Sequence, residues 1–382
     1  MPPVPPGDRR PAGPVYGPPP GYRPPPGYGP PPGYRPPQGY GPPPGYAAPY
    51  SAPFGAPPPP GVARPGIIPL RPLTLTDIFN GAVGYIRANP KATLGLTTMV
   101  EVVILLLSLL AAIGPLAAVS RIESGDLEPS LAAVSTSIAS LGSAALVNWL
   151  GSVVLSGMLT VVVGRAVFAA PITIGEAWGK VRGRLPALIG LALLELTGFV
   201  VVAGLVVVIL VGVRTAANTV AVVLIGFPLL LVAAAGLAYA YTVLLFAPIL
   251  IVLERLPVLD AIERSFALVR HSFWRVFGIN LLAAVVVAVV GGAISAPFNI
   301  AGQIMLMATS STAVLLAGSA VSSIGAAISQ IITTPFLAGV VVLLYTDRRM
   351  RSEAFDLTLQ TGAARSATAA EATDHLWLTR AV

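Results

Sequence analysis

The sequence contains no cysteine and only two histidines among its 382 residues. The absence of cysteine excludes disulfide bonds, thiolate nucleophiles and thiolate-ligated metal sites. Charged residues are also scarce, at 10% of the chain, whereas about a quarter of the residues of a soluble globular protein are charged. A chain with so little charge and with 55% apolar residues is not expected to fold in water.

Motifs of catalysis and of nucleotide or metal binding are missing as well. The sequence has no glycine-rich nucleotide-binding loop, no His-Glu-x-x-His and no recognisable serine, histidine and aspartate arrangement. His271 lies among arginines and has no second metal ligand four residues further on. We therefore expect no enzymatic activity, no catalytic residue, no cofactor and no metal site.

The apolar residues gather in long runs without an ionised side chain, such as 221–240 and 281–290. A helix needs about 20 mainly apolar residues to cross the roughly 30 Å core of a bilayer. The runs predict an all-α integral membrane protein with about six spans, at 92–114, 143–168, 187–212, 220–250, 276–297 and 315–345. Residues 131–142 form either a loop or an extra-cytoplasmic helix in this interpretation. The fourth and sixth spans are long, and Pro228 and Pro335 could kink or break them.

A shorter amphipathic segment precedes each pair of spans, at 74–89, 173–185 and 257–272. The first two segments begin alike, because Thr74 precedes Asp77 and Thr173 precedes Glu176 by three residues, the spacing of a capping box. The third begins with Pro257, which suits a first helical turn. We interpret the pattern as three repeats of an interfacial helix followed by a helical hairpin.

Basic residues predict the orientation of these spans. Nearly all of those that flank the spans lie on one side, and only Arg121 and Arg214 lie on the other. The positive-inside rule makes the basic side the cytoplasm, so both termini are expected there, in a multi-pass protein of the cell membrane. The net charge of +7 is therefore attributed to topology and to anionic membrane lipids, and no nucleic acid is expected as a partner.

Three regions follow from this arrangement: an arm at 1–65, a membrane domain at 70–360 and a disordered tail at 361–382. The arm repeats proline, glycine and tyrosine and is expected to be disordered, because it cannot bury enough apolar surface to offset its ordering entropy. It is either a solubilising tether or a multivalent ligand for a cytoplasmic protein partner. Its candidate docking residues recur every six positions: Tyr16, Tyr22, Tyr28, Tyr34, Tyr40 and Tyr46.

Several segments of the membrane domain resemble a known family. They are residues 70–80 (LRPLTLTDIFN), 86–90 (IRANP), 253–275 (LERLPVLDAIERSFALVRHSFWR) and 344–356 (LYTDRRMRSEAFD). The chain resembles the membrane-domain family named after glycerophosphoryl diester phosphodiesterases, in the proline-rich-arm form of actinobacterial membrane proteins. The sequence carries no His-Arg-Gly motif and no soluble stretch of the roughly 250 residues that a catalytic barrel of that type needs. The resemblance therefore implies a membrane architecture and does not imply hydrolysis.

Two acids within the predicted spans are the first candidate site. Glu101 and Glu195 each lie about ten residues into a span that opens a repeat, and Asn280 has a comparable place in the third repeat. A carboxyl group near the bilayer midplane must be protonated, be paired or face a polar cavity. These residues could form a polar site for a ligand, or they could simply hydrogen-bond Thr97, Thr197 or serines of neighbouring helices.

A second candidate site lies among the basic residues near the span ends, which could contact phospholipid headgroups or a partner. These residues are Arg255, Arg264, Arg270, Arg275, Arg348, Arg349 and Arg351. The alternative is a solvated polar face with ion pairs such as Asp260 with Arg264. A homo-oligomer could form through the small-residue face at 151–157.

Two functions fit these observations. The first is a non-catalytic membrane scaffold or regulator that presents the disordered arm to partners. The second is a transporter or lipid-handling protein in which Glu101, Glu195 and Asn280 line a cavity, with helix breaks at prolines such as Pro248. Two acids are few for a polar pathway and the repeats begin on the same side, which favours the scaffold.

Overall fold

The structure is a computed structural model that describes residues 67–69, 71–123, 131–168, 170, 172–308, 311–353, 355 and 377–378. All regular structure in these ranges is helical. The described residues belong to one compact unit, Pro59–Val382. The tyrosine-rich arm and its candidate docking residues lie outside the described residues.

Six helical segments of the described chain are long and apolar enough to cross a membrane. They are Pro90–Gly114, Ala145–Ala166, Ile174–Ala216, Thr219–Glu254, Phe273–Ala308 and Thr312–Glu353. The prediction of an all-helical chain with about six apolar spans is therefore confirmed.

Short helices precede pairs of long helices along the chain. The first group is α1 (Leu75–Ala88), α2 (Pro90–Glu123) and α3 (Leu131–Ala166). The second is α4 (Ile174–Val181), the 3-10 turn η1 (Arg182–Arg184), α5 (Leu185–Ala216) and α6 (Thr219–Leu244). After α7 (Ala247–Ile249) and the π-helix η2 (Leu250–Glu254), the third is α8 (Val258–Arg270), α9 (Phe273–Ala308) and α10 (Thr312–Glu353). That the three groups are copies of one repeat stays a prediction.

The first two short helices begin with the capping boxes that their sequences predict. Thr74 Oγ1 accepts a hydrogen bond from the Asp77 N–H at 3.2 Å, and the Asp77 carboxylate accepts one from the Thr74 N–H at 3.1 Å. Thr173 and Glu176 form the same reciprocal pair. Each box satisfies N–H groups that the first turn of a helix otherwise leaves without partners.

Two of the hairpins are longer than the predicted spans. α3 is continuous from Leu131, so residues 131–142 are its first part and form neither a loop nor a separate helix. α9 continues past the predicted span end at 297 to Ala308. At 36 residues, α9 is about 54 Å long in a straight geometry, which exceeds a hydrocarbon core of about 30 Å.

Close helix packing accounts for the extension of α9. Gly302 of α9 and Gly318 of α10 lie so near each other that a Cβ on Gly318 would come 2.8 Å from the Gly302 carbonyl oxygen. Small residues of this kind let helix backbones approach within membranes. The hairpin therefore stays packed beyond the residues that hydropathy assigns to it.

Neither of the two prolines that the sequence singled out breaks its helix. α6 passes through Pro228 and α10 passes through Pro335 without interruption. The fourth segment instead breaks in a turn at Leu245 and Phe246, and Pro248 lies in the first turn of the short α7 that follows. A proline is tolerated at that position because the first turn has no intrahelical partner for its N–H.

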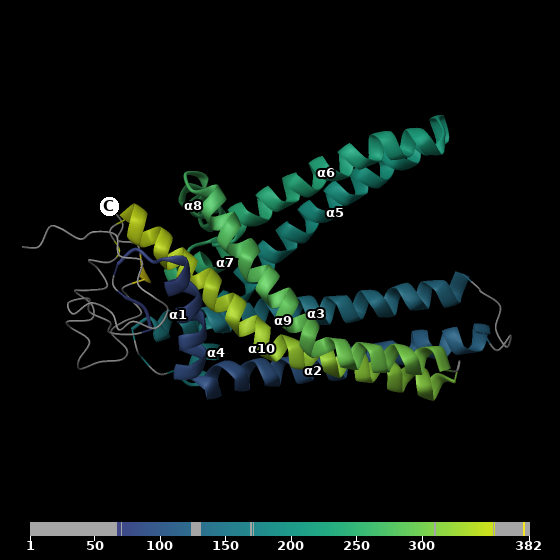
Figure 1. The fold of residues 1–382 in the computed structure, drawn as a ribbon, viewed down its shortest axis with the longest axis horizontal. Coiled ribbons are helices and arrows are strands. Elements are labelled where there is room, and N and C mark those ends of the chain that lie inside the picture. The colour runs from purple at the N-terminus through teal and green to yellow at the C-terminus, as the bar shows by residue number, and fades with distance from the viewer. Residues whose placement is uncertain are drawn as a thin grey trace, which may run out of the picture. The chain divides into compact units, whose positions relative to one another are not determined.

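The long helices divide into a packed group and a diverging hairpin. α10 contacts α9, α2, α3 and α1, whereas the α5–α6 hairpin contacts the rest mainly through α3, α7, α8 and α9. In Figure 1 this hairpin diverges from α2, α3, α9 and α10. Its side chains are largely exposed, as with Val208 at 68% and Val232 at 70%. Such apolar faces suit lipid tails as their surroundings.

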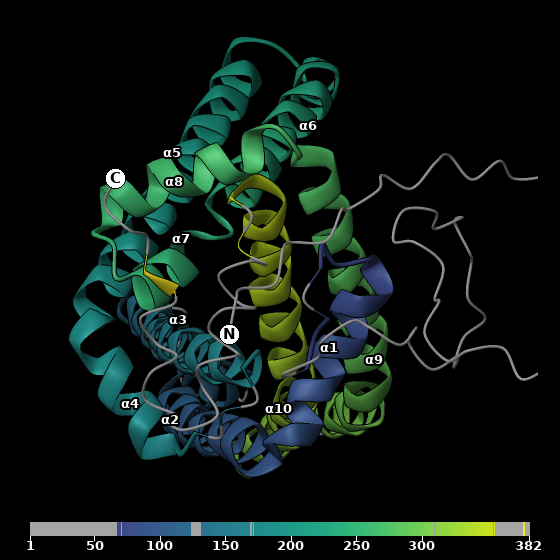
Figure 2. The same cartoon turned by 90° about the vertical axis from the view of Figure 1, so that its left-hand side faces the viewer.

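The buried core lies at one end of the long helices. It includes Tyr85 of α1, Leu159 of α3, Val181 of α4, Val269 of α8 and Leu343 of α10. Figure 2 looks onto this end and shows α1, α4 and α8 arranged around α10. The short amphipathic helices therefore join the hairpins into one packed unit.

Candidate functional site

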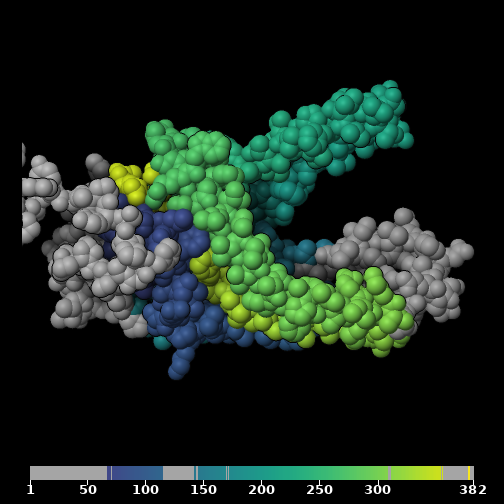
Figure 3. All heavy atoms as spheres, viewed as in Figure 1, coloured from purple at the N-terminus to yellow at the C-terminus, as the bar shows by residue number. Residues whose placement is uncertain are grey.

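A cavity of about 380 Å³ is lined by residues of α2, α3, α5, α6, α7 and α10. Polar side chains from several helices interrupt its mainly apolar wall. These polar residues are Glu101, Ser152, Ser156, Thr160, Glu195, Tyr241, Gln330 and Thr334. In Figure 3 the surface is hollowed between the α5–α6 hairpin and the helices below it.

Glu101 enters the cavity from α2 and is only 5% exposed. Its carboxyl group makes no hydrogen bond or ion pair with any residue of the described ranges. Thr97, which the sequence suggested as a partner, donates its hydroxyl to the carbonyl of Thr93 at 2.9 Å instead. The carboxyl group therefore faces the cavity rather than a neighbouring helix.

Glu195 reaches the same cavity from α5, nearly a hundred residues further along the chain. It is more exposed than Glu101 and is likewise without a hydrogen bond or ion pair to the described residues. The hydroxyl of Thr197 donates to the carbonyl of Leu193 at 2.7 Å and not to Glu195. The structure thus brings together two acids that the sequence could only place at similar depths.

Asn280 does not line this cavity. It is buried in α9 and interacts with Tyr241 of α6, which does line the cavity. The Asn280 Oδ1 atom has no hydrogen-bond partner in the described part of the chain. Sequence analysis missed Tyr241, because one aromatic residue in an apolar run carries no signal of a site.

Tyr85 fixes the helix that forms one wall of the cavity. Its hydroxyl donates a hydrogen bond to the carbonyl of Pro335, next to the cavity residue Thr334. Burial raises the pKa of Tyr85 well above its ordinary value, because the phenolate would lose its hydration. The hydroxyl therefore remains a donor that ties α1 to α10.

Two of the arginines predicted to contact headgroups, Arg264 and Arg349, form an ion-pair network around Glu254. This side chain is fully buried, and its Oε2 lies 2.7 Å from Arg264 Nε, in a geometry that is not a regular hydrogen bond. Its Oε1 accepts a hydrogen bond from the Tyr345 hydroxyl at 2.5 Å and lies 3.5 Å from Arg349 Nη1. Glu353 pairs with both arginines, at 2.8 Å and 3.0 Å.

The predicted pair of Asp260 with Arg264 is therefore wrong. Arg264 instead contacts Glu254 and Glu353, because α8 packs against η2 and α10. Arg264 therefore pairs with acids of η2 and α10 and not with Asp260 on its own helix.

Asp347 is the centre of a second group of contacts. Its carboxylate accepts a hydrogen bond from the Leu73 N–H at 2.8 Å and pairs with Arg351 at 2.8 Å and Arg275 at 3.2 Å. Both arginines also donate to the carbonyl of Leu73, at 3.0 Å and 2.9 Å. These contacts hold the segment before α1 against α9 and α10.

Backbone carbonyls satisfy further arginine donors of α10. Arg348 donates from Nε to the carbonyl of Leu268 at 3.2 Å, and Arg349 donates to the carbonyl of Trp377 at 3.0 Å. Trp377 is 3% exposed and packs against the rings of Phe168 and Phe355. The structure therefore places Trp377, a residue of the predicted disordered tail, in the core.

The other predicted sites have different outcomes. Arg255, Arg270 and His271 are exposed, and the described residues contain no group of acids and histidines that could hold a metal ion. The small-residue face at 151–157 packs within the chain, since Gly151 lies against Ile104 and Gly157 lies against Val181 and Leu188. The two glycines therefore serve packing within the chain, and a homo-oligomer through this face stays a prediction.

Comparisons with family models, with curated proteins and with solved structures found no match to this chain. The resemblance to the phosphodiesterase-associated membrane-domain family therefore stays an expectation from the sequence.

Proposed function

We propose that this protein is a non-catalytic, multi-pass membrane protein that binds an amphiphile, such as a lipid, in the cavity beside the α5–α6 hairpin. The observation that carries the proposal is that Glu101 and Glu195, from helices distant in sequence, line one cavity. Neither carboxyl group has a hydrogen bond or ion pair to the described residues. A bound polar group would supply the partner that each lacks.

The composition of the cavity fits a ligand with a small polar part. Its volume of about 380 Å³ is within the range of roughly 300–1,000 Å³ common for small-molecule sites. Apolar side chains such as Leu155, Leu244 and Val341 form most of the wall, and a few hydroxyl and carboxyl groups interrupt it. A hydroxyl or amine on the ligand would hydrogen-bond the acids while the rest of the ligand contacts the apolar wall.

The surroundings of Glu195 favour an amphiphile over a fully polar solute. Leu194, Leu196 and Phe199 are 51%, 44% and 54% exposed beside it on α5. An acyl chain could lie along this apolar helix while its polar end reaches the cavity. A fully polar solute would leave the apolar part of the wall without favourable contacts.

Other parts of the proposal rest on the sequence. We place the protein in the cell membrane with both termini in the cytoplasm, and we regard its three helix groups as repeats. The tyrosine-rich arm would then offer docking sites to a cytoplasmic protein. A scaffold alone, the other function that the sequence allows, would need no polar cavity between its helices.

The test is native mass spectrometry of the protein in nanodiscs made from the lipids of its own membrane. The variants are Glu101→Gln/Glu195→Gln, the control Asp260→Asn/Glu263→Gln with two exposed acids of α8, and a chain lacking residues 1–64. We expect a retained amphiphile in wild type, in the α8 control and in the shortened chain, and its loss in the cavity variant. Retention in all four proteins, or no retained amphiphile in wild type, would refute the proposal.

A scaffold predicts a different pattern in the same experiment. Protein partners would disappear only with residues 1–64, and the cavity variant would behave as wild type.

A further inference from the structure

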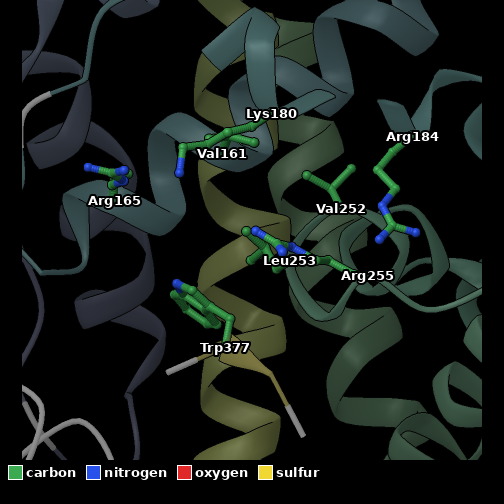
Figure 4. A pocket seen from close by; sticks show the side chains of 8 residues that line it. All are labelled: Val161, Arg165, Lys180, Arg184, Val252, Leu253, Arg255 and Trp377. Atoms are coloured by element: carbon green, nitrogen blue, oxygen red, sulfur yellow. The ribbon is translucent and has the colours of Figure 1, made fainter. Parts of the chain in front are cut away.

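The charged residues in the wall of the larger cavity, of about 380 Å³, are Glu101 and Glu195. No arginine, lysine or histidine of the described chain lines it. A smaller cavity of about 40 Å³, shown in Figure 4, is lined by basic side chains instead. Its basic residues are Arg165, Lys180, Arg184 and Arg255. Two carboxylates without a cation beside them repel an anion, so the larger cavity does not suit an anionic ligand.

Two hydroxyl groups add hydrogen-bond acceptors to the wall of the larger cavity. The hydroxyl of Thr160 donates its hydrogen to the carbonyl of Ser156 at 2.8 Å. The hydroxyl of Ser152 donates to the carbonyl of Asn148 at 2.9 Å. Because a hydroxyl has only one hydrogen, the lone pairs of these two oxygens remain for a ligand. Together with the two carboxyl groups, they match a ligand group that is rich in N–H donors.

Glu101 is the residue with the greatest need for such a group. It is 5% exposed, and its carboxyl group makes no bond to the described residues. A buried carboxylate without a partner is costly, and a bound cation lowers that cost as its counter-charge. An amine can also meet a neutral carboxyl group, because it takes up the proton and the two become an ammonium and a carboxylate. The same ion pair therefore forms whichever partner carries the proton on entry.

The cavity suits an organic cation better than an inorganic one. Ions such as Ca²⁺ take about six to eight oxygen ligands, whereas the described residues contain no group of acids and histidines that could hold a metal ion. The wall of the cavity is mainly apolar, and its volume is that of a small-molecule site. A ligand with one cationic end and an apolar remainder would use both parts of the wall.

We propose that the polar end of the amphiphile is an amine, which Glu101 and Glu195 hold as an ammonium group. The inference rests on the proposed function, because it names the chemical class of the ligand in the same cavity. An ammonium group has three N–H donors and no acceptor, which matches the acceptors of Thr160, Ser152 and the two acids. The site is therefore one for amphiphilic amines, and a neutral or anionic amphiphile should bind it less tightly.

The test compares three probes that share one alkyl chain and differ only in the polar end: dodecylamine, dodecanol and dodecanoate. The full chain in phosphatidylcholine nanodiscs receives each probe at the same concentration in the bilayer, and native mass spectrometry counts the probe that the protein retains. We expect about tenfold tighter retention of dodecylamine than of dodecanol, because an ion pair adds to the hydrogen bond that an alcohol can make. Dodecanoate should be retained least, since the acids repel it.

The variant Glu101→Gln/Glu195→Gln removes the two charges and keeps the size of both side chains. Its matched control is Asp260→Asn/Glu263→Gln, with two exposed acids of α8. The preference for dodecylamine over dodecanol should disappear in the cavity variant, because glutamine accepts a hydrogen bond but carries no charge. It should stay about tenfold in the control. The comparison of the three probes in wild type needs no variant, so it tests the inference even if the cavity variant misfolds.

Several results would overturn the inference. They are equal retention of dodecylamine and dodecanol in wild type, tighter retention of dodecanoate, retention of none of the probes, and a preference for dodecylamine that persists in the cavity variant. Each would exclude an amine as the ligand group that these acids hold. The proposed function itself fails in a different measurement, when wild type in nanodiscs of its own membrane lipids retains no amphiphile. The two failures can therefore be distinguished.

Discussion

Four acids in or next to the long helices lie in two regions that give a carboxyl group opposite surroundings. At the helix ends, Glu254 and Asp347 are fully buried, and each has several cationic or hydrogen-bonding partners. In the larger cavity, Glu101 and Glu195 have no hydrogen bond or ion pair to the described residues. Only the first region supplies opposite charges to its acids.

The difference separates acids that hold the fold from acids that are available to a ligand. Removing one member of a buried ion-pair network leaves the remaining charges without a partner, which is strongly destabilising. Removing a carboxyl group that makes no bond to the described residues takes away no such interaction. If the comparison is right, substitutions of the same chemistry should have very different effects on stability in the two regions.

The largest effect is expected for Glu254→Gln. This change leaves Arg349, whose side chain is 6% exposed, without its buried counter-charge and weakens the contact with Arg264. We expect the free energy of unfolding to fall by about 3–5 kcal/mol, measured by denaturant titration in micelles. Glu263→Gln, on an exposed position of the adjacent α8, should change it by less than about 0.5 kcal/mol. Equal effects of the two changes would mean that the ion pairs of Glu254 do not stabilise the fold more than an exposed acid does.

A smaller loss, of about 2 kcal/mol, is expected for Asp347→Asn. The side chains of Arg275 and Arg351 are 38% and 36% exposed, so water can solvate them when the carboxylate is lost. The amide oxygen can still accept the Leu73 N–H, but more weakly. Limited proteolysis should cut faster near Leu73 in this variant, whereas Asp260→Asn should cleave as wild type. Unchanged cleavage near Leu73 would mean that Asp347 does not hold the segment before α1.

Tyr345→Phe removes the hydroxyl that donates to Glu254 and accepts a weaker hydrogen bond from Arg349 at 3.3 Å. The ring keeps its contacts with Phe246 and Trp377 while the hydroxyl donor is lost. We expect a loss of about 1–2 kcal/mol, because the acceptor is a buried charge. In a double-mutant cycle with Glu254→Gln the two losses should not add, since both remove the same interaction. Full additivity would mean that Tyr345 acts independently of Glu254.

The smallest effect on stability is expected in the cavity. Glu101→Gln and Glu195→Gln should each change the free energy of unfolding by less than about 0.5 kcal/mol, because no partner in the described chain loses a bond. Both should nevertheless weaken retention of the proposed amphiphile in nanodiscs. A loss of stability as large as that of Glu254→Gln would mean that Glu101 and Glu195 stabilise the fold, as Glu254 does.

Properties that depend on neighbours along the chain could be predicted from the sequence. The capping boxes at Thr74 and Thr173 are set by residues three positions apart. The six apolar helices follow from the length of apolar runs, because a bilayer selects for runs that can cross its core. Helix ends were less predictable: α3 begins earlier and α9 ends later than predicted, and α9 packs closely against α10 beyond the apolar run.

The position of a residue along its helix could be predicted from the sequence, but its neighbours from other helices could not. The spacing of Glu101 and Glu195 indicated similar depths, whereas their convergence on one cavity depends on how α2 and α5 pack. Tyr241 and Gln330 join them from elements whose sequences carry no comparable signal.

The sequence by itself therefore determined that the chain is helical, that it has about six apolar spans and where its short capped helices begin. Only the tertiary structure decided that Arg264 meets Glu254 and not Asp260, and that Trp377 is buried. The physical reason is the separation along the chain of the residues that interact. Capping and apolar runs involve residues close in sequence, whereas the partner of a charge comes from an element far away in the chain.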